Sequence, residues 1–280
     1  MKATIIDVGG GMRGAFGTGI CDYLMDNSLY PFDRAIGVSA GAANLCTYIA
    51  GQRGRVLRYY VKYPKRKEYM SLSSLLRTGN YMNLGYIYPE LSGPGKEDPF
   101  DFSSYAKNPM DMVFVSTDAE TGKPAYFPKD SILPADFLPM MASAALPLAS
   151  KPVSYTGHLY FDGGISDPVP YRKAFELGAD KAVLILTKPL SVRRDPAKDR
   201  LTSSILSRRY PAAGEDLRRR AETYNKALDE MDSFIKEERL LVISPDTTCG
   251  VTTLKHKDED IMALYRHGYE KAGIIQDFLS

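Results

Sequence analysis

Near the start of the chain, short apolar runs alternate with segments in which apolar residues recur at helical spacing. The run Thr4–Val8 predicts a buried strand, and the periodic apolar residues after it predict a helix from Arg13 or Gly14 to Asp26. The pattern then repeats, with a strand predicted at Arg34–Val38 and a helix at Ala40–Ala50. Glycines stand at both strand-to-helix turns. This alternation is typical of an α/β fold with a parallel sheet.

The pattern continues to about residue 190 and then changes. Further strands are predicted at Met112–Ser116, Lys181–Thr187 and Leu240–Ser244. Helices are predicted at Ala135–Ala144, Val169–Leu177, Glu215–Lys236 and Asp258–Phe278, of which the last two are amphipathic. From about Arg193 the chain is richer in charge. We therefore expect an α/β core over residues 1–190 and a mostly helical C-terminal extension over residues 191–280, packed on that core.

The composition is that of a globular protein with nearly balanced charge. The chain has 280 residues, of which 44% are hydrophobic and 25% charged, and 36 Lys and Arg face 34 Asp and Glu. This balance gives no general basis for binding nucleic acid. The three cysteines lie far apart, which favours a reducing compartment. Because there is no apolar stretch of about 18 residues and no leader-like start, we expect a cytoplasmic protein.

A serine lies at the second strand-to-helix turn, in the sequence Gly37-Val38-Ser39-Ala40-Gly41. A G-x-S-x-G turn holds its serine in a strained backbone conformation and exposes the hydroxyl near a helix N-terminus. The helix dipole there favours developing negative charge. Ser39 is therefore the candidate nucleophile, and a plain turn of small residues is the alternative.

The first strand-to-helix turn is a glycine loop with one arginine, Gly9-Gly10-Gly11-Met12-Arg13-Gly14. Consecutive glycines can turn their amides toward one point and form an anion nest, as an oxyanion hole requires. Arg13 would add positive charge there or bind a phosphate group. Its alternative role is that of a surface arginine at a helix start.

The same loop fits the Gly-x-Gly-x-x-Gly fingerprint of dinucleotide-binding proteins through Gly9, Gly11 and Gly14. That function requires an acidic residue at the end of the second strand to bind the ribose. The second predicted strand ends before Ser39, and Asp33 precedes it. A dinucleotide-dependent enzyme is therefore the least supported alternative.

The third candidate is the aspartate of Asp162-Gly163-Gly164, which follows the apolar residues Leu159-Tyr160-Phe161. Alone, this sequence is an ordinary β-turn. After a short apolar stretch, however, the glycine turn can direct the Asp162 carboxyl into a cleft.

The three motifs together, in this order, resemble those of the patatin-like phospholipase family. The resemblance extends through Met141–Leu148 and covers roughly residues 3–190. The tail, with Thr253-Leu254 and Leu264–Tyr269, is similar to the C-terminal extension of a bacterial subgroup. The resemblance implies a three-layer α/β/α sandwich with a mostly parallel central sheet and a nucleophile elbow at Ser39.

The resemblance also implies a lipid acyl hydrolase of the phospholipase A, lysophospholipase or esterase type, without metal or cofactor. Ser39 would attack the ester carbonyl and Asp162 would accept its proton, so that the two form a catalytic dyad. Gly10, Gly11, Met12 and Arg13 would form the oxyanion hole. The supporting glycines of the motifs would be Gly9, Gly14, Gly37, Gly41, Gly163 and Gly164.

Two other interpretations remain open. The chain order of an α/β-hydrolase would allow a Ser-Asp-His esterase that uses His256 or His267. His158 precedes Asp162 and is expected on a hairpin. The other interpretation is a lipid-binding module of the same fold with little turnover.

Two features bear on the substrate. The candidates for an acyl channel, although such residues more often belong to a plain core, are Phe137, Leu138, Met140, Met141 and Leu146. Two basic stretches, Gln52–Glu68 and Arg193–Arg220, are most simply explained as solvated helix faces. The alternative is peripheral contact with an anionic membrane surface, which attracts basic residues.

Overall fold

The computed structural model describes residues 1–254 and 257–280, and its centre is one mixed sheet. In this part of the chain the strand order is β5-β6-β3-β2-β1-β7-β8, with β4 paired to β3. The strands are β1 (Ala3–Asp7), β2 (Arg34–Val38), β3 (Asp111–Asp118), β4 (Pro124–Pro128), β5 (Val153–Tyr155), β6 (His158–Asp162), β7 (Lys181–Ile185) and β8 (Leu240–Ile243). The pairings among β1, β2, β3, β7 and β8 are parallel, and those that involve β4, β5 and β6 are antiparallel.

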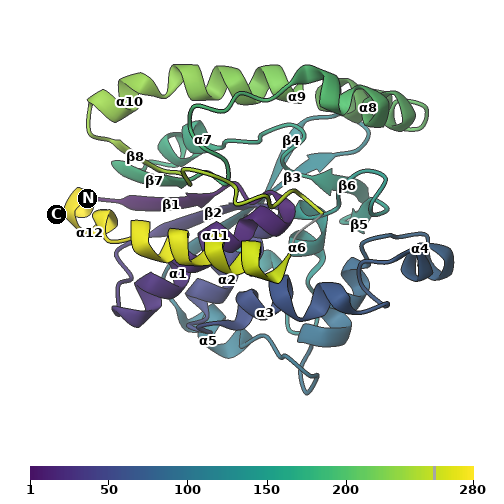
Figure 1. The fold of residues 1–280 in the computed structure, drawn as a ribbon, viewed down its shortest axis with the longest axis horizontal. Helices are drawn as coiled ribbons and strands as arrows, with labels where there is room; N and C mark the ends of the chain where they lie inside the picture. Colours follow the sequence, from purple (N-terminus) through teal and green to yellow (C-terminus); the bar gives the residue numbers. More distant parts are fainter. Residues whose placement is uncertain (255–256) are drawn as a thin grey trace.

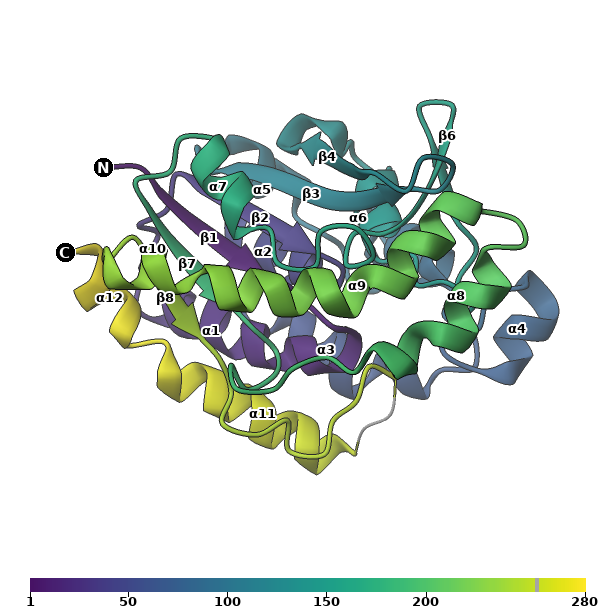
Figure 2. The ribbon, with the colours of Figure 1, turned by 90° about the horizontal axis from the view of Figure 1, so that it is seen from above.

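Helices cover both faces of the sheet (Figures 1 and 2). On one face lie α1 (Ala15–Asp26), α2 (Ala40–Ile49), α3 (Arg55–Val61), α5 (Phe102–Lys107), α6 (Leu138–Ser143) and α11 (Asp258–Lys271). On the other lie α7 (Tyr171–Glu176), α8 (Arg200–Leu206), α9 (Pro211–Glu230) and α10 (Asp232–Lys236). Separate apolar clusters fill the two interfaces, with Phe16 and Leu45 in one and Leu184 and Leu228 in the other. The expected α/β/α sandwich with a mostly parallel sheet is confirmed.

Most elements of the sheet and its helices lie where the hydrophobic pattern predicts them. The helix expected at Ala135–Ala144 is shorter, because Ala135 has a left-handed φ of 64° and α6 begins only at Leu138. The last predicted helix ends at Lys271, and α12 (Ile274–Leu279) follows after Gly273. The pattern does not predict β4, β5, α3, α5, α8 or the exposed helix α4 (Leu72–Thr78).

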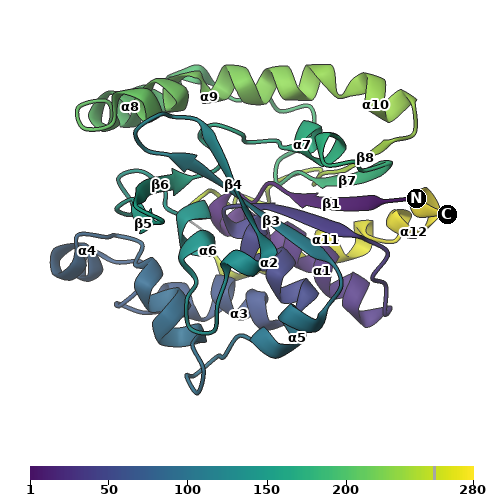
Figure 3. The same cartoon turned by 180° about the vertical axis from the view of Figure 1, so that it is seen from behind.

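The C-terminal extension is part of the same body. It is mostly helical, but its strand β8 pairs in parallel with β7 and extends the central sheet. Helix α11 lies against α1 (Figure 3). Ile261 and Leu264 of α11 belong to the same apolar cluster as Phe16. Among the described helices, none combines the length and apolar character that a bilayer span requires.

Candidate active site

Ser39 occupies a strained turn between β2 and α2. Its backbone has φ 57° and ψ −129°, a conformation that non-glycine residues rarely adopt. The Ser39 amide donates a hydrogen bond to Ser143 Oγ at 2.9 Å. The turn is also packed too tightly for a side chain at Gly41, since a Cβ there would lie 2.1 Å from the carbonyl oxygen of Asp7. The sequence thus places the serine at a rigid, closely packed helix start.

The glycine loop follows the neighbouring strand β1, and two of its amides are unengaged. Gly9, Gly10 and Gly11 all have positive φ, between 61° and 121°. The Gly9 amide donates to Asp7 Oδ1 at 2.8 Å, and the Thr187 hydroxyl donates to the Gly9 carbonyl. Within the described residues, the amides of Gly10 and Gly11 have no hydrogen-bond partner. They are the loop's available donors for an anion.

The carboxyl group of Asp7, the last residue of β1, anchors this loop through the Gly9 amide. The sequence motifs did not identify Asp7 as a site residue. Its Oδ2 accepts a hydrogen bond from Asn44 Nδ2 at 2.8 Å, while Oδ1 accepts from Gly9. Complete burial raises the pKa of Asp7 to about 6, against the opposing effect of these two hydrogen bonds.

Met12 and Arg13 differ from the two glycines. The Met12 amide donates to the Thr253 carbonyl at 3.0 Å, so in this arrangement it is occupied rather than open to an oxyanion. Arg13 donates through Nη1 to Thr253 Oγ1 at 3.2 Å, and its buried Nε has no partner within the described residues. Burial, followed by repulsion from Arg194, lowers the pKa of Arg13 to about 10. With 9% of its surface exposed, Arg13 is not the surface arginine of the alternative reading.

Sheet register brings Asp162 toward Ser39 although the two are far apart in sequence. Val38, just before Ser39, is paired with Val115 of β3, and the next residue of β3, Ser116, is paired with Asp162 of β6. Two strand spacings of about 4.8 Å therefore separate the two backbones, a gap that side chains span. Ser39 and Asp162 line one pocket.

The Asp162 carboxyl has one fixed oxygen and one free oxygen. Oδ1 accepts a hydrogen bond from the Gly164 amide at 2.8 Å, and the buried Oδ2 makes no hydrogen bond within the described residues. Burial raises the pKa of Asp162 above its ordinary value. The nearby Ser39 hydroxyl and the Gly164 amide oppose this effect, although the Ser39 hydroxyl makes no well-formed hydrogen bond to Oδ2.

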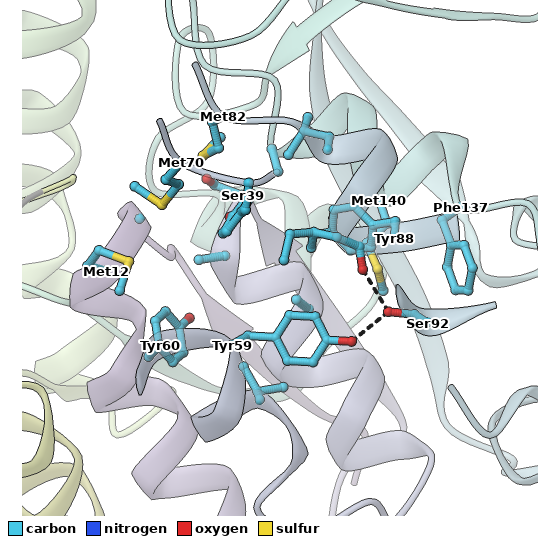
Figure 4. Close-up of a pocket in the computed structure, with 18 of the residues that line it drawn as sticks. Met12, Ser39, Tyr59, Tyr60, Met70, Met82, Tyr88, Ser92, Phe137 and Met140 are labelled. Carbon is cyan, nitrogen blue, oxygen red and sulfur yellow. Dashed lines mark hydrogen bonds between the residues drawn. The ribbon is translucent and has the colours of Figure 1, made fainter. Parts of the chain in front are cut away.

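Two pockets of different character meet at Ser39. The first is mainly apolar, with an empty volume of about 800 Å³ that includes its open mouth (Figure 4). The second pocket, with an empty volume of about 660 Å³ including its mouth, is polar and is lined by Asp162. Ser39, Gly11, Leu146 and Thr253 line both. A molecule with an apolar half and a polar half can therefore place its junction at the Ser39 hydroxyl.

The apolar pocket contains three of the five residues expected in an acyl channel. Phe137, Met140 and Leu146 line it, whereas Leu138 and Met141 do not. Most of the remaining wall comes from residues 55–100, which the sequence did not assign to an acyl channel; these include Val56, Tyr60, Met70, Met82, Leu84, Ile87 and Tyr88.

The polar pocket contains charged residues that the sequence did not assign to the site. Lys188, Arg194 and Arg220 line it together with Arg13 and the uncharged Tyr224. Two of them belong to the basic stretch Arg193–Arg220, whose only signal was its charge. No group of three or more His, Cys, Asp or Glu suited to a metal ion occurs in the described part of the chain.

The described histidines lie away from Ser39. His267 Nε2 is 3.0 Å from Asp246 Oδ2, and its ring packs edge-on against Phe16. His158 lies 3.4 Å from Asp118 and is more than half exposed. Neither lines a pocket that contains Ser39. The triad with His267 therefore has no geometric support, and His256 lies outside the described residues.

The chain is similar to two known proteins. Over 207 residues the chain is 30% identical to the Escherichia coli (strain K12) protein named "Uncharacterized protein YjjU", which covers 70% of this chain and 54% of that protein. The chain thus spans about half the length of this relative. The crystal structure of VipD from Legionella pneumophila aligns with 99% of this chain and 66% of that one, at 14% identity and a TM-score of 0.47.

Two family matches divide the chain. Residues 210–273 match a family described as a domain of unknown function, DUF6363. Residues 8–175, which include the glycine loop, Ser39 and Asp162, match the family described as patatin-like phospholipase. The chain therefore belongs to the patatin-like phospholipase family.

Proposed function

We propose that this protein hydrolyses carboxylic esters of lipids, with Ser39 as nucleophile and Asp162 as general base. The observation that carries the proposal is the position of Ser39 at the junction of an apolar and a polar pocket, with the unpartnered Asp162 Oδ2 in the polar one. An acyl chain fits the apolar pocket, and the alcohol half of the ester fits the polar pocket.

In the proposed reaction the Ser39 oxygen attacks the ester carbonyl while its proton passes to Asp162 Oδ2. The amides of Gly10 and Gly11 bind the oxyanion that forms, and the departing alcohol takes the proton from Asp162. Water, deprotonated by Asp162, then attacks the acyl-enzyme. As the fatty acid is released, Asp162 returns the proton to the Ser39 oxygen, which restores the hydroxyl and the carboxylate. Each donor in an oxyanion hole typically contributes ~10²–10³ in rate.

A carboxylate is a weak base toward serine, and two features of the site compensate. Burial raises the pKa of Asp162, so that its ionised form is a stronger base than an exposed aspartate. The strained turn fixes the Ser39 hydroxyl in place, which lowers the entropic cost of reaching the attacking geometry. A dyad of this kind suits esters better than amides.

Labelling with a fluorophosphonate probe and hydrolysis of p-nitrophenyl esters test the proposal together. We expect Ser39→Ala to abolish both and Asp162→Asn to reduce ester turnover by about 10³-fold or more. Asp167→Asn is the matched control, because Asp167 is also a largely buried carboxyl with a raised pKa, held by Tyr126 instead. Labelling that persists in Ser39→Ala would refute the assigned nucleophile, and an unlabelled wild type would favour the binding module.

We also propose peripheral contact with an anionic membrane surface, through α4 rather than through the two basic stretches. Several cations of the first stretch are engaged: Arg58 pairs with Asp98, and Lys62 and Arg66 pair with Glu97. Helix α4 projects at one end of the molecule (Figure 3), with Leu72 71% and Leu76 87% exposed.

The position of α4 links membrane contact to the substrate pocket. The helix lies between Met70 and Met82, which form a β-bridge with each other and both line the apolar pocket. No acidic residue occurs between Glu68 and Glu90, and Arg77 lies in the last turn of the helix. Exposed leucines beside a basic residue suit the headgroup region of an anionic bilayer.

A further inference from the structure

Four cationic side chains gather on the polar side of Ser39. Arg13, Lys188, Arg194 and Arg220 all line the pocket that contains Ser39 and Asp162. They come from separate segments: the glycine loop, the connection after β7, and helix α9. Arg220 and Tyr224 lie one turn apart on α9, within the segment that matches the domain of unknown function. The C-terminal extension thus reaches into the pocket of the catalytic core.

Carboxylates balance only part of this charge. Asp199 accepts hydrogen bonds from Arg220, with Nη2 at 2.5 Å and Nε at 3.0 Å, and its Oδ2 lies 3.5 Å from Arg194 Nη2. Within the described residues, Lys188 has no ion-pair or hydrogen-bond partner for its ammonium group, and Arg13 has only the Thr253 hydroxyl. Counting Asp162 and Asp199 as ionised, four positive groups face two negative ones.

The cations of this pocket also repel one another, which lowers their pKa values. Burial, followed by repulsion from Arg194 and Arg13, lowers the pKa of Lys188 to about 8. The buried Arg13 Nε, which has no partner, leaves a donor available in the same pocket. A bound anion would satisfy this donor and relieve the repulsion. Guanidinium groups match phosphate oxygens in geometry, and an ammonium group binds phosphate as a point charge.

We propose that Arg13, Lys188, Arg194 and Arg220 form a binding site for the phosphate dianion of a phosphomonoester at the alcohol end of the substrate. This inference rests on the proposed function, since it assigns the two halves of the ester to the two pockets that meet at Ser39. The excess of two positive groups matches a phosphomonoester, which carries a charge of about −1.5 to −2 near neutral pH. A choline headgroup would bring a further cation into a cationic pocket.

Three esters with the same oleoyl chain test the proposal: lysophosphatidic acid, lysophosphatidylcholine and monooleoylglycerol. With all three below their aggregation limits, we expect wild-type kcat/KM for lysophosphatidic acid to exceed the other two by about tenfold or more. We expect Lys188→Met to reduce this preference by about tenfold. A purely structural defect would slow all three esters alike. Equal wild-type rates, or an unchanged preference in Lys188→Met, would overturn the proposal.

The matched control is Lys226→Met. Lys226 lies on α9 like Arg220, but its side chain is 71% exposed and pairs with Glu230 outside the polar pocket. The wild-type preference should persist in this variant. An equal loss of preference in Lys226→Met and Lys188→Met would attribute the effect to overall charge and refute the local site.

Binding without turnover separates this proposal from the proposed hydrolase. Calorimetric titration of inorganic phosphate into Ser39→Ala at pH 7 should show binding that weakens about fivefold or more when Lys188→Met is added. Phosphate binding with no turnover of any ester supports the anion site and refutes the hydrolase. Absence of phosphate binding refutes the anion site even if esters are cleaved. Phosphate binding without an ester preference refutes the assignment of the anion to the substrate.

Discussion

The carbonyl oxygen of Thr253 accepts a hydrogen bond from the amide of Met12 at 3.0 Å and so connects the C-terminal segment to the glycine loop. The Thr253 hydroxyl also accepts a hydrogen bond from Arg13. Thr253 lines both pockets beside Ser39, so the C-terminal segment contributes to the site as well as to the fold.

We expect Gly11→Ala to lower kcat/KM by about 10²-fold, which is about the loss that follows removal of one oxyanion-hole donor. Gly11 has φ 61°, and a Cβ there would lie 2.2 Å from the Thr253 carbonyl oxygen, so the loop or the segment must move. Steady-state kinetics with a p-nitrophenyl ester measure the effect. Gly178→Ala is the control, because Gly178 has φ 87° but open space around a Cβ. Equal losses in the two variants would show that strain alone, and not this contact, is responsible.

The pH dependence of kcat/KM should have an acid limb set by Asp162. The base must be ionised, so activity is lost as the pH falls through the pKa of Asp162, which burial raises above 3.8. Arg220 and Arg194 lower this pKa, so Arg194→Gln should move the midpoint to higher pH. A pH–rate profile of both proteins measures the shift. A limb that moves to lower pH in Arg194→Gln would contradict the assignment.

Histidine substitutions should leave ester turnover within about threefold of wild type if the dyad operates without an imidazole base. His267 is engaged with Asp246 and Phe16, and His158 is exposed near Asp118. We would measure kcat/KM for His158→Ala, His256→Ala and His267→Ala, with circular dichroism to confirm folding. A folded variant of His256 or His267 that loses activity by orders of magnitude would restore the triad.

Asp7 should make the folded state less stable as the pH rises. Burial raises its pKa from 3.8 to about 6, so the folded protein retains this proton over a range where the unfolded chain has lost it. As the pH falls from 7 to 4, the unfolding free energy of the wild type should rise by up to about 3 kcal/mol relative to that of Asp7→Asn. Urea unfolding of both proteins across this range tests it. Parallel pH profiles for the two would rule out this role of the Asp7 charge.

Replacing the exposed leucines of α4 should weaken membrane contact. Leu72→Ser with Leu76→Ser removes two side chains that are 71% and 87% exposed, and we expect partitioning onto anionic vesicles to fall by about tenfold or more. Liposome co-sedimentation measures the effect. Leu133→Ser, at a position 55% exposed outside α4, serves as the control. Unchanged sedimentation of the double variant would exclude α4 as the contact.

Local sequence was sufficient for the parallel core and for the three motifs. The strand β2 has the predicted bounds, and α2 begins at the predicted residue, because apolar runs and glycine turns act through neighbouring residues. The same local logic marked Ser39 and the glycine loop. It did not predict β4 and β5, whose short strands carry little periodic signal and depend on pairing with β3 and β6.

The sequence by itself determined which residue types stand at the strand ends, and hence the nucleophile, the glycine amides and the aspartate as candidates. Only the tertiary structure decided which of them meet, because register across β2, β3 and β6 sets the position of Asp162 relative to Ser39. The tertiary structure also places Arg194 and Arg220 in the polar pocket, and it pairs the Met12 amide with the Thr253 carbonyl oxygen. Contacts between distant segments depend on how buried surfaces fit together, and no local pattern encodes that fit.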